Sequence, residues 1–139
     1  MCNWGVSATI GLASALISSI VYFRDHSPDN PEYAFNGVIC DARADFLERD
    51  LGRTNILRVR LPEDMRAEFF DYSDDFTLDA IKIISGGNTS FYSLESPNPV
   101  SRDFVTANQP VFDSYLERIV AANTGQPVSC DIPGIQAHR

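Results

Sequence analysis

The chain has 139 residues and a formal net charge of −8, which leaves room for one small domain. Such an acidic balance excludes nucleic acids and anionic lipid headgroups as the expected main ligands. A content of 44% hydrophobic and 11% aromatic residues also excludes a disordered tail. The composition therefore indicates a folded module that does not bind nucleic acid.

The stretch from Trp4 to Phe23 contains no charged residue. As an α-helix it would be roughly 30 Å long, about the thickness of the hydrocarbon core of a bilayer. Its apolar run exceeds that of a signal peptide and lacks a basic start, so an uncleaved anchor is favoured over a cleaved leader. The sequence thus predicts a single-pass anchor in the lipid bilayer over 1–23, a linker over 24–32 and an acidic α+β domain over 33–139.

Small residues recur within this stretch at four-residue spacing and would form one stripe on a helix: Ser7, Gly11, Ala15 and Ser19. A flat stripe allows the backbone of another helix to approach closely. The stripe predicts an interface with the helices of other membrane-protein subunits. The alternative is that small residues are common in membrane helices for reasons unrelated to packing.

Two cysteines lie near opposite ends of the remaining chain, at Cys40 and Cys130. A disulfide between them would close a loop of about 90 residues, which in the chain-entropy model contributes roughly 4–5 kcal/mol. Two buried free thiols are the alternative. Arg24 favours a cytoplasmic domain by the positive-inside rule, whereas the cysteine pair favours an extracytoplasmic one, periplasmic or luminal. The second topology is expected.

Periodicity and turn residues predict the elements of the acidic domain. They are a strand over 33–39, a helix over 41–51, a strand over 56–61, a short helix over 62–70, a hairpin of 76–85 with 89–95, and a helix over 108–123. An extended tail would then be held through Cys130. The predicted fold class is a single N-terminal transmembrane helix followed by a small α+β domain, with a β-hairpin and two helices as its main parts.

The strand over 56–61 alternates cleanly, with Arg58 and Arg60 on the side opposite its apolar residues. Two outward arginines can clamp a carboxylate or a phosphate. They can equally form a solvated strand face, and the pattern favours that simpler interpretation.

Acidic residues gather in the segment after 70, at Asp71, Asp74, Asp75 and Asp79. Carboxylate oxygens of this kind bind Ca²⁺, but the spacing of a helix-loop-helix calcium site is missing. The preferred hypothesis is a solvated acidic loop that either repels proteins that are not its partners or docks a basic protein surface.

The histidines, His26 and His138, stand near the two ends of the chain, and no nucleophile, zinc, nucleotide or haem motif occurs. The chain is therefore expected to be no enzyme and to use neither cofactor nor metal. The leading hypothesis is an accessory subunit of a multi-subunit membrane complex. The alternative is a membrane-anchored inhibitor of the immunity type, acting through the acidic loop.

Overall fold

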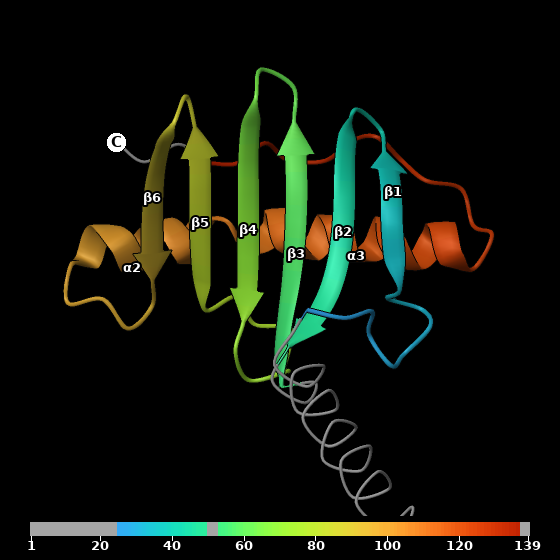
Figure 1. The fold of residues 1–139 in the computed structure, drawn as a ribbon, viewed down its shortest axis with the longest axis horizontal. Helices are drawn as coiled ribbons and strands as arrows, with labels where there is room; N and C mark the ends of the chain where they lie inside the picture. Colours follow the sequence, from blue (N-terminus) through green and yellow to red (C-terminus); the bar gives the residue numbers. More distant parts are fainter. Residues whose placement is uncertain (1–24, 50–52, 137–139) are drawn as a thin grey trace, which may run out of the picture.

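The computed structural model describes residues 25–49 and 53–136, which form one antiparallel sheet with two helices on one side (Figure 1). Each strand pairs with its neighbours in sequence, in the order β1-β2-β3-β4-β5-β6. The strands are β1 (Phe35–Ile39), β2 (Ala42–Arg49), β3 (Thr54–Leu61), β4 (Met65–Asp71), β5 (Ala80–Ser85) and β6 (Asn88–Ser93). Such a meander needs only short connections, because antiparallel neighbours meet at the same edge of the sheet.

The helices α2 (Pro99–Ala107) and α3 (Gln109–Asn123) cross behind the strands and cover one face of the sheet (Figure 1). The main core lies between these two layers. Its largest fully buried side chains are Ile39, Phe46, Leu57, Val59, Phe69, Leu78, Ile81, Val105, Val111, Phe112 and Ile119. Burial of this apolar surface is the main force that holds the helices against the sheet.

The alternation of side chains along each strand defines a second face. In β2, Ala42, Ala44 and Phe46 are buried on the helix side, whereas Arg43 is exposed and Asp45 is half-buried on the opposite side. We call the sheet face opposite α2 and α3 the open face. It is the face turned to the reader in Figure 1.

The predicted fold class is wrong. In place of an α+β domain built on one hairpin, the described chain has a six-stranded antiparallel sheet with helices on one face. Across residues 25–49 and 53–136, no helix combines the length and hydropathy needed to cross a bilayer. The proposed anchor Trp4–Phe23 and its stripe lie outside the described residues.

The predicted helix over 41–51 is wrong because residues 42–49 form β2. The spacing of Ala44 and Leu47 suits one helical face, but the alternation of Ala44 and Phe46 suits a strand equally well. Much of β2 pairs with strands on both sides, for instance Ala44 with Gly37 and with Val59. Pairing on both sides outweighs a weak local preference for helix.

The short helix predicted over 62–70 is wrong for a related reason. Glu63 and Asp64 adopt positive φ angles of 67° and 60°, which bend the chain back after β3 instead of starting a helix. Leu61 then pairs with Met65, and the following residues form β4. The acidic residues that suggested a helix N-terminus are turn residues.

Several local predictions are confirmed. The strand over 56–61 lies within β3, and the helix over 108–123 corresponds to α3. The hairpin between β5 and β6 turns at Gly86 and Gly87, whose φ angles of 58° and 81° are those that glycine adopts without strain. The helix α2 was not predicted, although Asn98 caps it by accepting a hydrogen bond from Val100 N at 3.1 Å.

The C-terminal tail returns to the core and is fixed at several points. Cys130 forms a disulfide with Cys40, which follows β1 directly. The guanidinium of Arg118 donates hydrogen bonds to the carbonyl oxygens of Ser129 and Asp131, each at 2.9 Å. The tail is thus anchored both to the end of β1 and to α3.

Part of the predicted linker belongs to the sheet. His26 exchanges backbone hydrogen bonds with Glu48, at 2.9 Å and 2.7 Å, and so pairs with β2. This pairing brings the neighbouring Asp25 to Arg49 and Arg58, at the edge of the open face.

Candidate functional site

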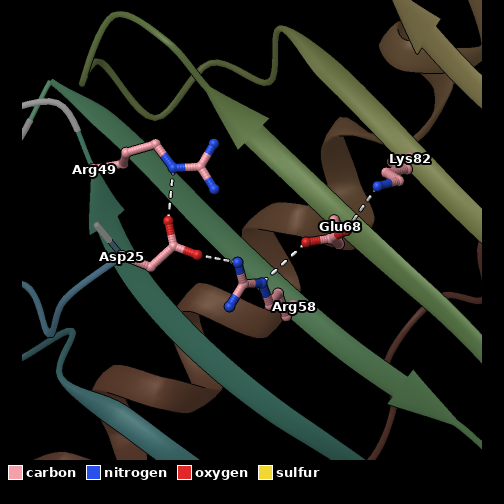
Figure 2. Close-up of polar contacts among 5 residues, drawn as sticks. All are labelled: Asp25, Arg49, Arg58, Glu68 and Lys82. Carbon is pink, nitrogen blue, oxygen red and sulfur yellow. Dashed lines mark hydrogen bonds and ion pairs between the residues drawn. The ribbon is translucent and has the colours of Figure 1, made fainter. Parts of the chain in front are cut away.

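The open face carries rows of side chains that run across the strands, because residues paired in register lie side by side. One row consists of charges of alternating sign, contributed by β2 to β5: Asp45, Arg58, Glu68 and Lys82. Arg58 Nε lies 3.0 Å from Glu68 Oε2, and Lys82 Nζ lies 3.7 Å from Glu68 Oε1. Figure 2 shows Glu68 between these two cations. We call these four residues the alternating row.

Asp25 adds a carboxylate to the alternating row from outside the sheet. Its Oδ1 lies 2.6 Å from Arg49 Nε, and its Oδ2 pairs with Arg58, so that one carboxylate joins two arginines (Figure 2). Burial opposes ionisation of Asp25, but the hydrogen bonds from Arg49 and Arg58 outweigh it and lower the pKa of this carboxyl. The same contacts act on the guanidinium of Arg58. Burial by itself would lower the pKa of this group, but the hydrogen bonds to Glu68 and Asp25 outweigh burial and raise it.

The next row on the open face is different. Arg43, Arg60 and Arg66 lie directly opposite one another on β2, β3 and β4. All three are exposed, and within the described chain none forms an ion pair with an acidic residue. Of the three side chains, only that of Arg43 has a hydrogen-bond partner among residues 25–49 and 53–136: a guanidinium nitrogen donates to Asn36 Oδ1 at 3.1 Å. We call these three residues the arginine row.

Like charges in register are unfavourable, since directly opposed side chains have Cβ atoms only about 5 Å apart. The rest of the chain offers little compensation, because the residues outside the described ranges include a single acidic side chain, Asp50. The arginine row is therefore a local conflict that no ion pair relieves within the described residues, although Asp45 lies close enough for Arg43 to act on its pKa. Conflicts of this kind in a folded protein mark functional sites more often than neutral surface.

A shallow hollow of about 460 Å³ lies over the arginine row. It is lined by Asn36, Arg43, Asp45, Arg58, Val59, Arg60, Arg66, Ala67, Glu68 and Ile84. The acidic members of the alternating row form one side of this hollow. Burial raises the pKa of Asp45 even though Arg58 and Arg43 act in the opposite direction.

Beyond the alternating row, the open face becomes apolar. Ile56, Phe70 and Ala80 form a second small buried cluster, with Leu47 packed against it. Phe91, on the edge strand β6, lies with its ring centroid 6.5 Å from that of Phe70 and is 57% exposed. The open face thus combines an unpaired basic row, a neutralised row and an apolar cluster.

The acidic loop between β4 and β5 is organised by Asp71, which is fully buried. Its carboxylate accepts hydrogen bonds from Asn55 Nδ2 at 3.0 Å, Ser73 N at 3.1 Å and Phe76 N at 2.8 Å. Asp74 accepts a further bond from Asn55 Nδ2 at 2.7 Å. Asp71 therefore holds the loop from within and is not available to a partner.

The remaining loop acids divide between the interior and solvent. Asp79 is half-buried and accepts a hydrogen bond from Tyr72 N at 2.7 Å, and burial raises its pKa. Asp74 and Asp75 are exposed. A role of these two in docking a basic surface stays a prediction.

A metal ion could be held only by the group Asp71, Asp75 and Asp79, whose nearest oxygens lie within 4.8 Å of one another, as far as the described residues go. Hydrogen bonds from the loop itself already account for this geometry. His26, which precedes β1, has a structural role: its backbone pairs with β2, and its ring Nδ1 lies 3.0 Å from Ser27 O.

Local patterns in the sequence indicate only part of the arginine row. The alternation over 56–61 predicts an outward Arg60 on a strand, but Arg43 and Arg66 fall in predicted helices that do not form. The signal that identifies them is the two-residue alternation of charge along β2 and β4. Searches against protein-family models, curated proteins and solved structures found no match to this chain.

Proposed function

We propose that this chain is a non-enzymatic accessory protein whose open face binds an acidic segment of a partner protein. The observation that supports the proposal is the arginine row, three exposed arginines in register that form no ion pair within the described residues. Arginine is the side chain best suited to bidentate contacts with carboxylates. A complementary partner would remove the repulsion among the three guanidinium groups.

The open face already binds one carboxylate through arginine side chains. The carboxylate of Asp25 comes from a segment outside the six strands and binds two arginines of the open face, Arg49 and Arg58. The arginine row lies one register step away along β3, since Arg58 and Arg60 point to the same side. A partner carboxylate at the row would thus repeat an interaction that the neighbouring row already makes.

A binding role is favoured over a catalytic one by the chemistry of the row. Arginine stays protonated under ordinary conditions, so it does not serve as a general base or nucleophile. The row is also exposed to water, whereas electrostatic catalysis gains most in a water-excluded site. The net charge of −8 further favours a short acidic segment over a polyanion such as nucleic acid.

We also infer that the domain works outside the cytoplasm, in a periplasm or lumen. The disulfide between Cys40 and Cys130 is compatible with an extracytoplasmic location and supports this inference. Thiol labelling of the protein from its native source, with and without reductant, tests it. Free thiols at both positions before reduction would refute it.

The binding proposal is tested by fluorescence anisotropy with a labelled glutamate-rich peptide, and with a lysine-rich and a glycine-serine peptide of equal length. We expect the wild-type protein to bind only the glutamate-rich peptide, more tightly at low salt. Replacing Arg43, Arg60 and Arg66 together with glutamine should abolish binding. Arg53→Gln, which removes one exposed arginine outside the row, should leave binding unchanged and is the control for each of the three replacements made singly.

Three results would contradict the proposal. The first is a failure of the glutamate-rich peptide to bind the wild-type protein. The second is equal binding of the lysine-rich peptide, and the third is full binding by the triple variant once circular dichroism shows that it is folded.

A further inference from the structure

We propose that the arginine row is a site for one tetrahedral oxyanion with three acceptor oxygens, a phosphate or sulfate ester group carried by a side chain of the partner. This inference rests on the proposed function and specifies the group that the open face recognises. It is drawn from the number, register and surroundings of Arg43, Arg60 and Arg66.

The number of arginines is the first reason. On the same face, the single carboxylate of Asp25 is shared by two guanidinium groups, those of Arg49 and Arg58. One carboxylate at the arginine row would leave at least one cation without a partner. A phosphate ester carries a charge of about −1.5 to −2 on three acceptor oxygens. A sulfate ester carries a single charge on three such oxygens, so either group offers an acceptor to each of the three guanidinium groups.

The register is the second reason. Neighbouring strands lie about 4.8 Å apart, so the outer members of the row, Arg43 and Arg66, leave the sheet roughly 10 Å from each other with Arg60 between them. Long arginine side chains can converge over that distance on one small group. Asn36 restrains one member, because its Oδ1 accepts a hydrogen bond from Arg43 at 3.1 Å.

The surroundings limit the size of the ligand. Asp45 and Glu68 line one side of the hollow over the row, so positive potential does not extend along the strands in that direction. A polyanion laid across the face would meet these carboxylates and be repelled. The hollow of about 460 Å³ has room for a tetrahedral group together with part of the side chain that carries it.

The experiment uses the full chain and four short labelled peptides that differ at one central residue: phosphoserine, sulfotyrosine, glutamate or serine. Anisotropy is measured at about 0.1 M salt, where weak surface attraction is screened. We expect the phosphoserine or the sulfotyrosine peptide, or both, to bind about tenfold more tightly than the glutamate peptide. Inorganic phosphate or sulfate should displace the bound peptide, and which of the two oxyanions is preferred identifies the source.

Two variants locate the site. Arg60→Gln removes the central guanidinium and should weaken oxyanion binding about tenfold or more, while Arg53→Gln should leave it unchanged. Arg66→Gln serves as the second test if Arg60→Gln does not fold. Unchanged binding by a folded variant of either kind would overturn the assignment to this row.

The outcomes separate this inference from the function on which it rests. If the glutamate peptide binds as tightly as the oxyanion peptides, the oxyanion inference is refuted and the acidic-partner function stands. The same conclusion follows if none of the four peptides binds but the glutamate-rich peptide does. If the glutamate-rich peptide also fails to bind the wild-type protein, both proposals are refuted.

Discussion

Arg60 and Arg66 lie directly opposite each other in the register of β3 and β4, and both are exposed. One register step away on the same strands, Arg58 lies opposite Glu68 with a nitrogen-oxygen distance of 3.0 Å. The two strands therefore carry one favourable and one unfavourable cross-strand pair on the same face. Arg66 is therefore expected to lower the stability of the fold while contributing to the binding of an acidic partner.

We expect Arg66→Glu to stabilise the fold, because an opposite charge would then face Arg60. Cross-strand charge pairs contribute roughly 0.2–1 kcal/mol, so a gain of this size in the free energy of unfolding is predicted. The same variant should lose binding to acidic peptides. Urea denaturation and anisotropy on the same sample measure both effects.

Arg53→Glu is the matched control, since it makes the same charge change at an exposed position outside the row. If Arg66→Glu lowers stability relative to this control, the arginine row is not a source of repulsion. If Arg66→Glu gains stability but still binds acidic peptides as the wild-type protein does, the arginine row is a source of repulsion but not the binding site.

The ion pairs of Asp25 predict a specific pH dependence. Its carboxyl has a pKa below the ordinary value of 3.8, so the stability it contributes is fully present above that value and is lost as the pH falls through the lowered pKa of the folded protein. Asp25→Asn should therefore be destabilised by about 1 kcal/mol at neutral pH, the scale of a partly exposed pair. The difference in the free energy of unfolding between the wild-type protein and Asp25→Asn should stay constant down to about pH 5 and disappear as the pH falls below about 4.

Urea denaturation of both proteins at a series of pH values measures this difference. Comparing the two proteins removes most of the contribution of other carboxyls, such as Asp45 and Asp79, whose pKa values are raised. A difference that persists unchanged at the lowest pH would show that the ionised form of Asp25 is not what stabilises the fold.

Asp71 and Asp75 are expected to behave differently although they are four residues apart in one acidic loop. Asp71→Ala removes a buried acceptor and leaves several backbone and side-chain donors unpaired, so a loss of about 3 kcal/mol or more is predicted. Asp75→Ala removes an exposed carboxylate and should cause no comparable loss. Thermal or urea unfolding of the two variants distinguishes them, and equal stability would refute the structural role of Asp71.

Reduction of the disulfide should lower stability substantially. Cys40 and Cys130 are separated by 90 residues, for which the chain-entropy model gives about 4–5 kcal/mol. We expect a large shift in the urea midpoint on adding reductant, and the same shift in a Cys40→Ser, Cys130→Ser double variant. A shift equivalent to less than about 1 kcal/mol would mean that the loop entropy is not the dominant contribution.

Local signals in the sequence were reliable where a residue type has one strong conformational preference. Gly86 and Gly87 marked the hairpin, because positive φ angles are easily adopted only by glycine. The alternation that ends at Pro62 identified β3, and α3 was found from its apolar spacing and from Pro110 near its start. In each case the deciding interaction lies within a few residues of chain.

Helix or strand could not be decided locally for residues 42–49 and 65–71. Both segments have apolar spacings that suit either structure, and Glu63 with Asp64 resembles the first turn of a helix. The outcome depended on pairing with strands distant in sequence, which no local window contains. That error also hid the arginine row, since Arg43 and Arg66 were placed on separate helices.

The sequence by itself determined the composition that requires a core, the positions of the tight turns and the excess of acidic charge. Only the tertiary structure decided which charges meet. Sheet register places Arg58 opposite Glu68 but Arg60 opposite Arg66, and shifting the pairing of one strand by a single residue would exchange the two faces. Register is set by burial of the whole helix-side face, so the pattern on the open face emerges only once the complete sheet has formed.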